Sequence, residues 1–171
     1  MFQTLTWKCL ENLSLPFLQS LKTIRVPIKV LAKLIENTSG HLIEVSIDYL
    51  RYSYVRHNTE IDNERIIRAI YQNCPNLIYL KIPFKSNNIS EFGELLIKCQ
   101  HLKGLHIIFD DANDDWEDGI SIFNWDYLFE VLSKSSPNSL FMFKFYFDVT
   151  PKLEQLKSFF DNWRGRHPML L

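Results

Sequence analysis

Two nine-residue stretches of this chain share one pattern: CPNLIYLKI at residues 74–82 and CQHLKGLHI at residues 99–107. In each stretch a cysteine stands three residues before a leucine, and the apolar residues then follow the spacing apolar-x-x-apolar-x-apolar. The end of each stretch alternates apolar with other residues, which is typical of a strand with one buried face. A looser third copy, SPNSL, occupies residues 136–140. The sequence therefore predicts a strand-forming unit that is used more than once.

The same spacing occurs along the whole chain. Successive matches begin between 19 residues (Phe2 to Leu21) and 38 residues (Leu102 to Leu140) apart. Periods of roughly 20 to 50 residues are the signature of repeat architectures. A seventh match begins at Leu170. The six complete matches are Phe2-Leu5-Trp7, Leu21-Ile24-Val26, Leu42-Val45-Ile47, Leu77-Leu80-Ile82, Leu102-Leu105-Ile107 and Leu140-Phe143-Phe145.

Helical patterns separate the expected strands. Their beginnings are marked by residues that favour helix starts, which are Ser or Asp as caps and a first-turn proline. The expected helices cover residues 28–37, Asp62 to about Asn73, a stretch that begins at Ser90, Trp125 to Lys134, and a stretch that begins at Thr150-Pro151. Alternation of short strands and helices predicts parallel strands joined by helical crossovers.

Two parallel folds fit this alternation, and the strand faces distinguish them. A doubly wound sheet buries both faces of its strands and shows solid runs of Val and Ile. Here polar or charged residues take alternate strand positions, among them Arg25, Glu44, Lys81 and Lys144. One strand face is therefore expected to be solvated while the other packs on helices. We predict an α/β curved solenoid with irregular repeats, with parallel strands on the concave side and helices on the convex side.

The helix-Cys-Pro-x-Leu-x-x-Leu-x-Ile arrangement resembles the cysteine-containing leucine-rich repeats of F-box proteins, especially the fungal F-box/leucine-rich-repeat families. Cys74–Ile82 and Cys99–Ile107 carry the resemblance, which extends more loosely over residues 1–171. It implies a leucine-rich-repeat-like solenoid that recruits a target protein, while a separate F-box binds the adaptor of a cullin-type ubiquitin ligase. We find no F-box here, and we expect residues 1–171 to be a single such domain, truncated at both ends.

Two other functions stay open beside this substrate-recruiting role. One is a stand-alone scaffold or interaction module without a ubiquitin link. The other is an enzyme of the doubly wound α/β class, which the sequence disfavours because no GxSxG, Walker A or GxGxxG motif occurs. With only five glycines, a phosphate-cradling loop is not expected either. We therefore predict a protein that is not an enzyme, with no catalytic residues and no cofactor.

Composition narrows the partners and the compartment. Lys and Arg total 19 and Asp and Glu total 20, so the net charge of −1 gives no general attraction to nucleic acid or anionic membranes. Three cysteines do not suggest a disulfide framework. The first 30 residues lack a signal-peptide pattern, and no apolar run is long enough to span a bilayer. We expect an intracellular protein, cytoplasmic or nuclear, that binds neither nucleic acid nor membranes.

The candidate binding surface is the solvated strand face. If the repeat register holds, basic and aromatic residues gather on it, and such a mixture suits recognition of an acidic or phosphorylated protein segment. The predicted partner-binding residues are Arg25, Tyr79, Lys81, His106, Lys144 and Tyr146.

Metal binding is not predicted. Acidic residues crowd the stretch Asp110–Asp118, but an EF-hand loop that begins at Asp111 needs glycine at its sixth position and has Trp116 there. No His or Cys group has zinc spacing. We interpret the acidic stretch as a solvated insertion, and the sequence leaves open whether it contacts a partner.

Overall fold

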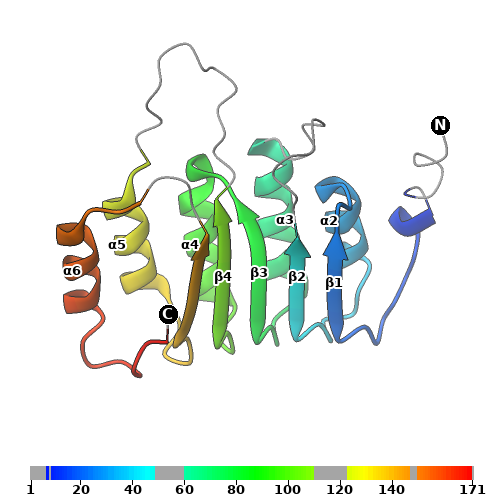
Figure 1. Ribbon diagram of the computed structural model, residues 1–171. Helices are drawn as coiled ribbons and strands as arrows, with labels where there is room; N and C mark the ends of the chain where they lie inside the picture. The colour runs from blue at the N-terminus through cyan, green and yellow to red at the C-terminus, as the bar shows by residue number, and fades with distance from the viewer. Residues whose placement is uncertain (1–6, 8, 49–59, 110–122, 147–149, 171) are drawn as a thin grey trace, which may run out of the picture.

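Five short parallel strands form one sheet in the computed structural model, which describes residues 7, 9–48, 60–109, 123–146 and 150–170 (Figure 1). A helix follows each strand along the chain, with a short 3-10 turn (Ser86–Asn88) ahead of the third. The elements are β1 (Ser20–Ile24), α2 (Ile28–Glu36), β2 (Glu44–Asp48), α3 (Glu60–Asn73), β3 (Tyr79–Phe84), α4 (Ile89–Lys98), β4 (Gly104–Phe109), α5 (Trp125–Ser135), β5 (Met142–Tyr146) and α6 (Leu153–Asn162).

The strands lie side by side in the order in which they occur along the chain, β1-β2-β3-β4-β5. Connections between parallel strands are almost always right-handed, so an order without a reversal places every crossover helix on the same face of the sheet. Each helix accordingly packs against the next one, from α2 to α6 (Figure 1). The other face carries no helix among the described residues. This confirms the predicted α/β class with parallel strands, one covered face and one open face.

The register explains why the apolar spacing recurs. Val45, Leu80, Leu105 and Phe143 stand opposite one another on neighbouring strands. All four are at most 2% exposed because they point toward the helices. Leu77, Leu102 and Leu140, which begin the spacing, are fully buried just before their strands. The spacing therefore marks the positions of each strand that enter the core.

The first two matches to the spacing were wrong. Trp7 is helical, so it does not end a strand, while Phe2 and Leu5 lie outside the described residues. In β1 it is Leu21, not Ile24, that stands opposite Val45. The strand stops at Ile24 because Arg25 adopts a positive φ of 61° and turns the chain toward α2. The seventh match, which begins at Leu170, was also placed in the wrong register. Leu170 forms a parallel bridge with Met142, so it joins the exposed row of Tyr79 and Gly104. It is 55% exposed, whereas the residues that begin the third to sixth matches are buried ahead of their strands.

The expected helix spans are close to those observed, but three expected starts are displaced. Asp62 lies inside α3, and Ser90 lies inside α4, which Asn88 precedes. Thr150 and Pro151 come before α6, whose first turn is closed by Gln155: its side chain accepts a hydrogen bond from the Lys152 backbone N–H at 2.9 Å. Side-chain types alone did not locate these starts, since several residues able to cap a helix precede each one.

One buried polar residue connects the helical layer to the sheet. Asn63 of α3 is fully buried, and its side-chain amide donates a hydrogen bond to the Pro83 carbonyl at 2.7 Å. Its Oδ1 accepts hydrogen bonds from the Lys85 backbone N–H and from the Asn88 side chain, both at 3.1 Å. These bonds hold the end of β3 and the turn before α4 against α3. Because these polar groups are buried, leaving them without hydrogen-bond partners would cost free energy of folding.

Candidate functional site

The register of the sheet brings three predicted basic residues into one row on the open face. Lys81 of β3 stands opposite His106 of β4, which stands opposite Lys144 of β5. Tyr79 belongs to the adjacent row, and Tyr146 lies opposite Ile108 two residues further along the strands. Five of the six predicted residues therefore occupy the β3–β5 part of the open face.

Arg25 is the exception, and its predicted place on the strand was wrong. It follows the end of β1 and its backbone N–H donates to the Asp48 carbonyl at 3.3 Å. The residue of β1 that joins the row is Lys22, which stands opposite Ser46. The complete row across the sheet is Lys22, Ser46, Lys81, His106 and Lys144.

In the neighbouring row an aromatic ring packs closely over a glycine. Tyr79 stands opposite Gly104, and Gly104 stands opposite Met142. A Cβ atom on Gly104 would lie 2.6 Å from Cδ1 of the Tyr79 ring, so a side chain there would displace the ring. Met142 sulfur would lie 3.6 Å from the same Cβ. Glycine thus allows Tyr79 to lean across β4 toward Met142, and the two exposed side chains form one apolar surface.

Ion pairs neutralise part of the open face. Lys81 Nζ lies 2.5 Å from Asp48 Oδ2, and Lys22 Nζ lies 2.8 Å from Glu44 Oε1. Lys144 is exposed and has no ion-pair partner among the described residues. The basic and aromatic surface expected from the sequence is therefore a mixed surface in which Lys144 offers the uncompensated positive charge.

His106 is neutral at neutral pH. Its partial burial between the two lysines lowers its pKa below the ordinary value of 6.5, with burial the main cause and the charges of Lys81 and Lys144 adding to it. Asp48 acts in the opposite direction but does not restore the pKa. At pH 7 the row therefore presents an imidazole that donates or accepts a hydrogen bond rather than a further cation beside the lysines.

A shallow pocket of about 200 Å³ lies over these rows. Tyr79 and Met142 provide its apolar wall, and Lys81, His106 and Lys144 line it on the charged side. Glu44 and Ser46 lie at the β2 side. Sequence reasoning did not select Lys22, because the β1 register was misread. Nor did it select Met142, which lies beside Gly104 on β5, or Asp48, which pairs with Lys81, because both neighbourhoods depend on the three-dimensional register.

The cysteines of the two defining stretches are structural. Cys74 and Cys99 are fully buried, and burial raises the pKa of each thiol to about 12. The thiolate is the reactive form, so both groups are protonated and unreactive at pH 8. Their equivalent positions, one residue after α3 and α4, explain their recurrence in the sequence.

This burial predicts a simple result in thiol titration. At pH 8 an Ellman reagent should modify one thiol per native chain rapidly, because Cys9 is exposed. All three cysteines of the chain should react after unfolding in guanidinium chloride. A Cys9→Ser variant should show no fast reaction, and rapid modification of two or three thiols in the native protein would contradict the described packing.

The described residues provide no other candidate chemistry. No group of three His, Cys, Asp or Glu side chains among them is arranged to hold a metal ion. The whole acidic stretch Asp110–Asp118 lies outside the described residues, and its role stays a prediction. Over the same described ranges, no helix has the length and apolar character needed to span a bilayer.

Comparison with known proteins adds no relative: no protein-family model matches this chain, and no curated protein sequence matches it. The fold and the surface chemistry therefore carry the functional argument.

Proposed function

We propose that this chain is a leucine-rich-repeat-like protein-recognition module whose open sheet face binds an acidic or phosphorylated segment of a partner protein. The observation that carries this proposal is the pocket of the β3–β5 face. There an exposed aromatic ring and a thioether, Tyr79 and Met142, adjoin the uncompensated charge of Lys144. Aromatic and Met side chains are enriched in protein interfaces, where they provide apolar anchors beside polar contacts.

The charge of the open face and the topology of the sheet favour a protein partner over a nucleic acid or an enzyme substrate. The paired lysines leave too little positive charge on the face for phosphate-backbone binding, which depends on several cations in series. Ligand clefts of doubly wound enzymes form where the strand order reverses, and the order of the five described strands has no reversal. An exposed parallel sheet face that combines ion pairs, the charge of Lys144 and exposed apolar side chains such as Tyr79 and Met142 suits an extended or loop segment of a protein.

The proposed biological role follows from the resemblance of Cys74–Ile82 and Cys99–Ile107 to F-box leucine-rich repeats. In that role the chain is the substrate-recruiting part of a ubiquitin-ligase receptor, and an F-box encoded outside it would bind the adaptor. A stand-alone interaction module is the alternative. Sequencing the transcript upstream of the Met1 codon separates the two. An in-frame F-box supports the ligase role, and an in-frame stop codon supports the stand-alone module.

The binding surface itself is tested by reversing its charges. Peptides that differ only in a central phosphoserine, glutamate, alanine or lysine are printed on an array and probed with the labelled chain. The phosphoserine and glutamate peptides should bind best. A Lys81→Glu/Lys144→Glu variant should bind them about tenfold more weakly, because two attractive charges become repulsive.

The matched control for this experiment reverses two exposed lysines of the helical layer, Lys98→Glu and Lys157→Glu, which changes the net charge by the same amount. This control should bind the acidic peptides nearly as well as the native chain. Circular dichroism melting curves establish that each variant is folded. Equal losses in both variants would mean that net charge, not the open face, determines binding, and unchanged binding in the Lys81/Lys144 variant would exclude the proposed surface.

A further inference from the structure

His106 lies at the centre of the charged row on the open face. Lys81 on β3 and Lys144 on β5 stand directly opposite it, one on each side. Neighbouring strands lie about 4.8 Å apart, so both lysine side chains leave the sheet one strand spacing from the imidazole. All three residues line the shallow pocket of the open face. A group bound at the centre of this row is therefore close to His106 and to both lysines.

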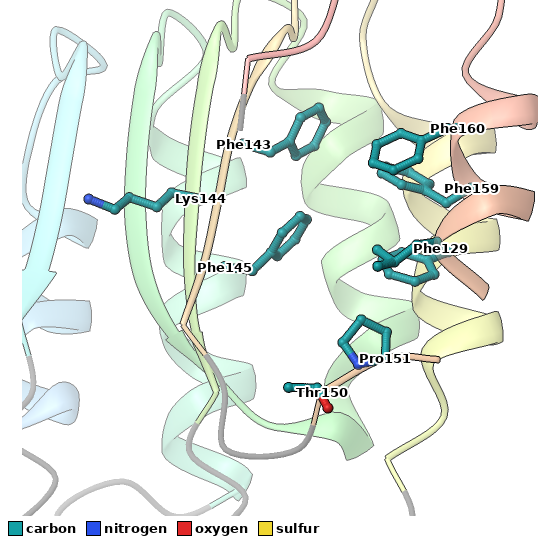
Figure 2. Close-up of a pocket in the computed structure, with 9 residues that line it drawn as sticks. Phe129, Phe143, Lys144, Phe145, Thr150, Pro151, Phe159 and Phe160 are labelled. Carbon is teal, nitrogen blue, oxygen red and sulfur yellow. The ribbon is translucent and has the colours of Figure 1, made fainter. Parts of the chain in front are cut away.

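Lys144 belongs to the open face, although its strand also lines a second pocket. That pocket, an apolar one of about 380 Å³, lies on the helical side of β5 and is lined mainly by phenylalanines of α5, β5 and α6 (Figure 2). Figure 2 shows the Lys144 side chain pointing away from these phenylalanines, toward the other side of the sheet. Its ammonium group is therefore available to the row that contains His106.

Several titratable groups surround His106 on the open face. Both carboxylates on β2 are already bound to lysines: Asp48 to Lys81 at 2.5 Å and Glu44 to Lys22 at 2.8 Å. No hydrogen bond to the imidazole is formed among the described residues. Neither carboxylate therefore holds a proton on the ring in the free chain. The charged and phenolic groups on the strands of this face are Lys22 on β1, Glu44 and Asp48 on β2, Tyr79 and Lys81 on β3, and Lys144 and Tyr146 on β5.

The imidazole is neutral in the free chain because its surroundings oppose a positive charge. Partial burial lowers the pKa of His106 below its ordinary value of 6.5, and the charges of Lys81 and Lys144 lower it further. An anion over the row reverses the electrostatic part of this effect, because an opposite charge within about 4 to 6 Å favours the charged form of a titratable group. The protonated imidazole then donates a charge-assisted hydrogen bond to the anion, which is stronger than a neutral one.

The two lysines can bind the same anion while keeping their present contacts. An ammonium group has three N–H donors, so the pairing of Lys81 with Asp48 leaves donors free on its Nζ. Lys144 has no ion-pair partner among the described residues. A carboxylate or phosphate group has enough acceptor sites for both lysines and for a protonated His106.

We propose that an anionic side chain of the partner segment binds over Lys81, His106 and Lys144, and that His106 takes up a proton from solvent when it binds. The open face then binds acidic segments more tightly as the pH falls from about 8 to about 6. This inference rests on the proposed function, because it requires an anionic partner at this face. The proton uptake and the resulting pH dependence go beyond it.

The direction of the pH dependence follows from the charge of His106 in the free and bound chains. Above the pKa that His106 has in the complex, the ring is neutral in both states and the pH has no effect. Between the bound and the free pKa values, binding adds a proton, so lowering the pH strengthens binding. By reciprocity, the factor by which the anion raises the proton affinity equals the factor by which the proton raises the affinity for the anion.

NMR of the histidine rings in the full chain measures both pKa values of His106. The probe is the end-blocked central-glutamate peptide of the array series, because glutamate stays ionised between pH 8 and 6, whereas phosphoserine titrates there. At millimolar peptide the titration midpoint of His106 should rise by about one pH unit, a tenfold gain in proton affinity. The Kd from amide shifts should be about five- to tenfold lower at pH 6 than at pH 8. The central-alanine peptide should produce neither effect.

Matched variants assign the effect to His106. His106→Gln has no group that titrates at this position, so its Kd values at pH 6 and pH 8 should agree within about twofold. His101→Gln, at an exposed turn position outside the pocket lining, should keep the full pH dependence. Lys144→Gln should raise the titration midpoint of His106 in the free chain, because one of the charges that oppose its protonation is removed.

The possible outcomes separate this inference from the proposed function. If only the phosphoserine peptide binds, the His106 midpoint is measured with that peptide. Binding of an acidic peptide with an unchanged His106 midpoint would overturn the proton uptake and leave the open-face function intact. A pH dependence that persists in His106→Gln would do the same. No binding of either acidic peptide at millimolar concentration would overturn both.

Discussion

Replacing Leu105 by alanine is expected to lower the free energy of unfolding by about 3 to 5 kcal/mol. Leu105 is 2% exposed at the middle of the row that also holds Val45, Leu80 and Phe143. Truncation removes its apolar contacts and leaves a cavity that β3 and β5 on either side prevent from collapsing. Since a domain is typically stable by about 5 to 15 kcal/mol, this one change removes a large share of the total.

Urea unfolding followed by circular dichroism measures the effect of Leu105→Ala. Ile97→Ala is the control, because Ile97 is 48% exposed on α4 and its truncation should cost less than about 1 kcal/mol. A loss below about 1.5 kcal/mol in the Leu105 variant would contradict the assignment of this row to the core.

Asn63→Ala is expected to cost roughly 2 to 4 kcal/mol, although it removes only a small polar side chain. The variant loses the bond to the buried Pro83 carbonyl and the two bonds that Oδ1 accepts from Lys85 and Asn88. A buried carbonyl without a donor carries its full desolvation cost, and the turn between β3 and α4 loses its attachment to α3.

Asn76→Ala provides the comparison for Asn63, since Asn76 is exposed and its side chain donates one long bond of 3.3 Å to the Gly40 carbonyl. Its cost should lie within about 0.5 kcal/mol in the same urea titration. Hydrogen exchange should also be faster at residues 85–89 in the Asn63 variant. Equal stability of the two variants would mean that Asn63 does not link the helix to the sheet.

The sequence predicted the strands between Glu44 and Tyr146 well, because their inward positions are occupied by strongly apolar residues such as Leu80, Ile82, Leu105 and Ile107. It misplaced the register of β1 because two registers of the apolar residues overlap there. Leu21, Ile24 and Val26 satisfy the spacing by their apolar character, but the strand ends at Ile24, and Thr23 takes the inward position beside Ile47. The positive φ of Arg25, which ends the strand, depends on the tertiary structure and is not encoded in the apolar spacing.

The sequence predicted that most residues of the candidate site share one sheet face, but it did not predict the charge of that face. The spacing placed Tyr79, Lys81, His106 and Lys144 on one face, and the register brings them together. It did not indicate that Asp48 lies next to Lys81 or that burial lowers the pKa of His106. The apolar pocket was missed because its lining comes from α5, β5 and α6, and no local pattern reports how far a helix stands from a strand.

The sequential strand order has a consequence for synthesis on the ribosome. Each of the strands β2 to β5 pairs with the strand synthesised just before it, so none of them needs a pairing strand that is translated later. Because each pairing closes only one strand–helix crossover, less entropy is lost than if the paired strands came from opposite ends of the chain. We therefore expect assembly to follow translation, with each new strand and helix extending a layer that has already formed. The most recently added strand always presents the growing edge.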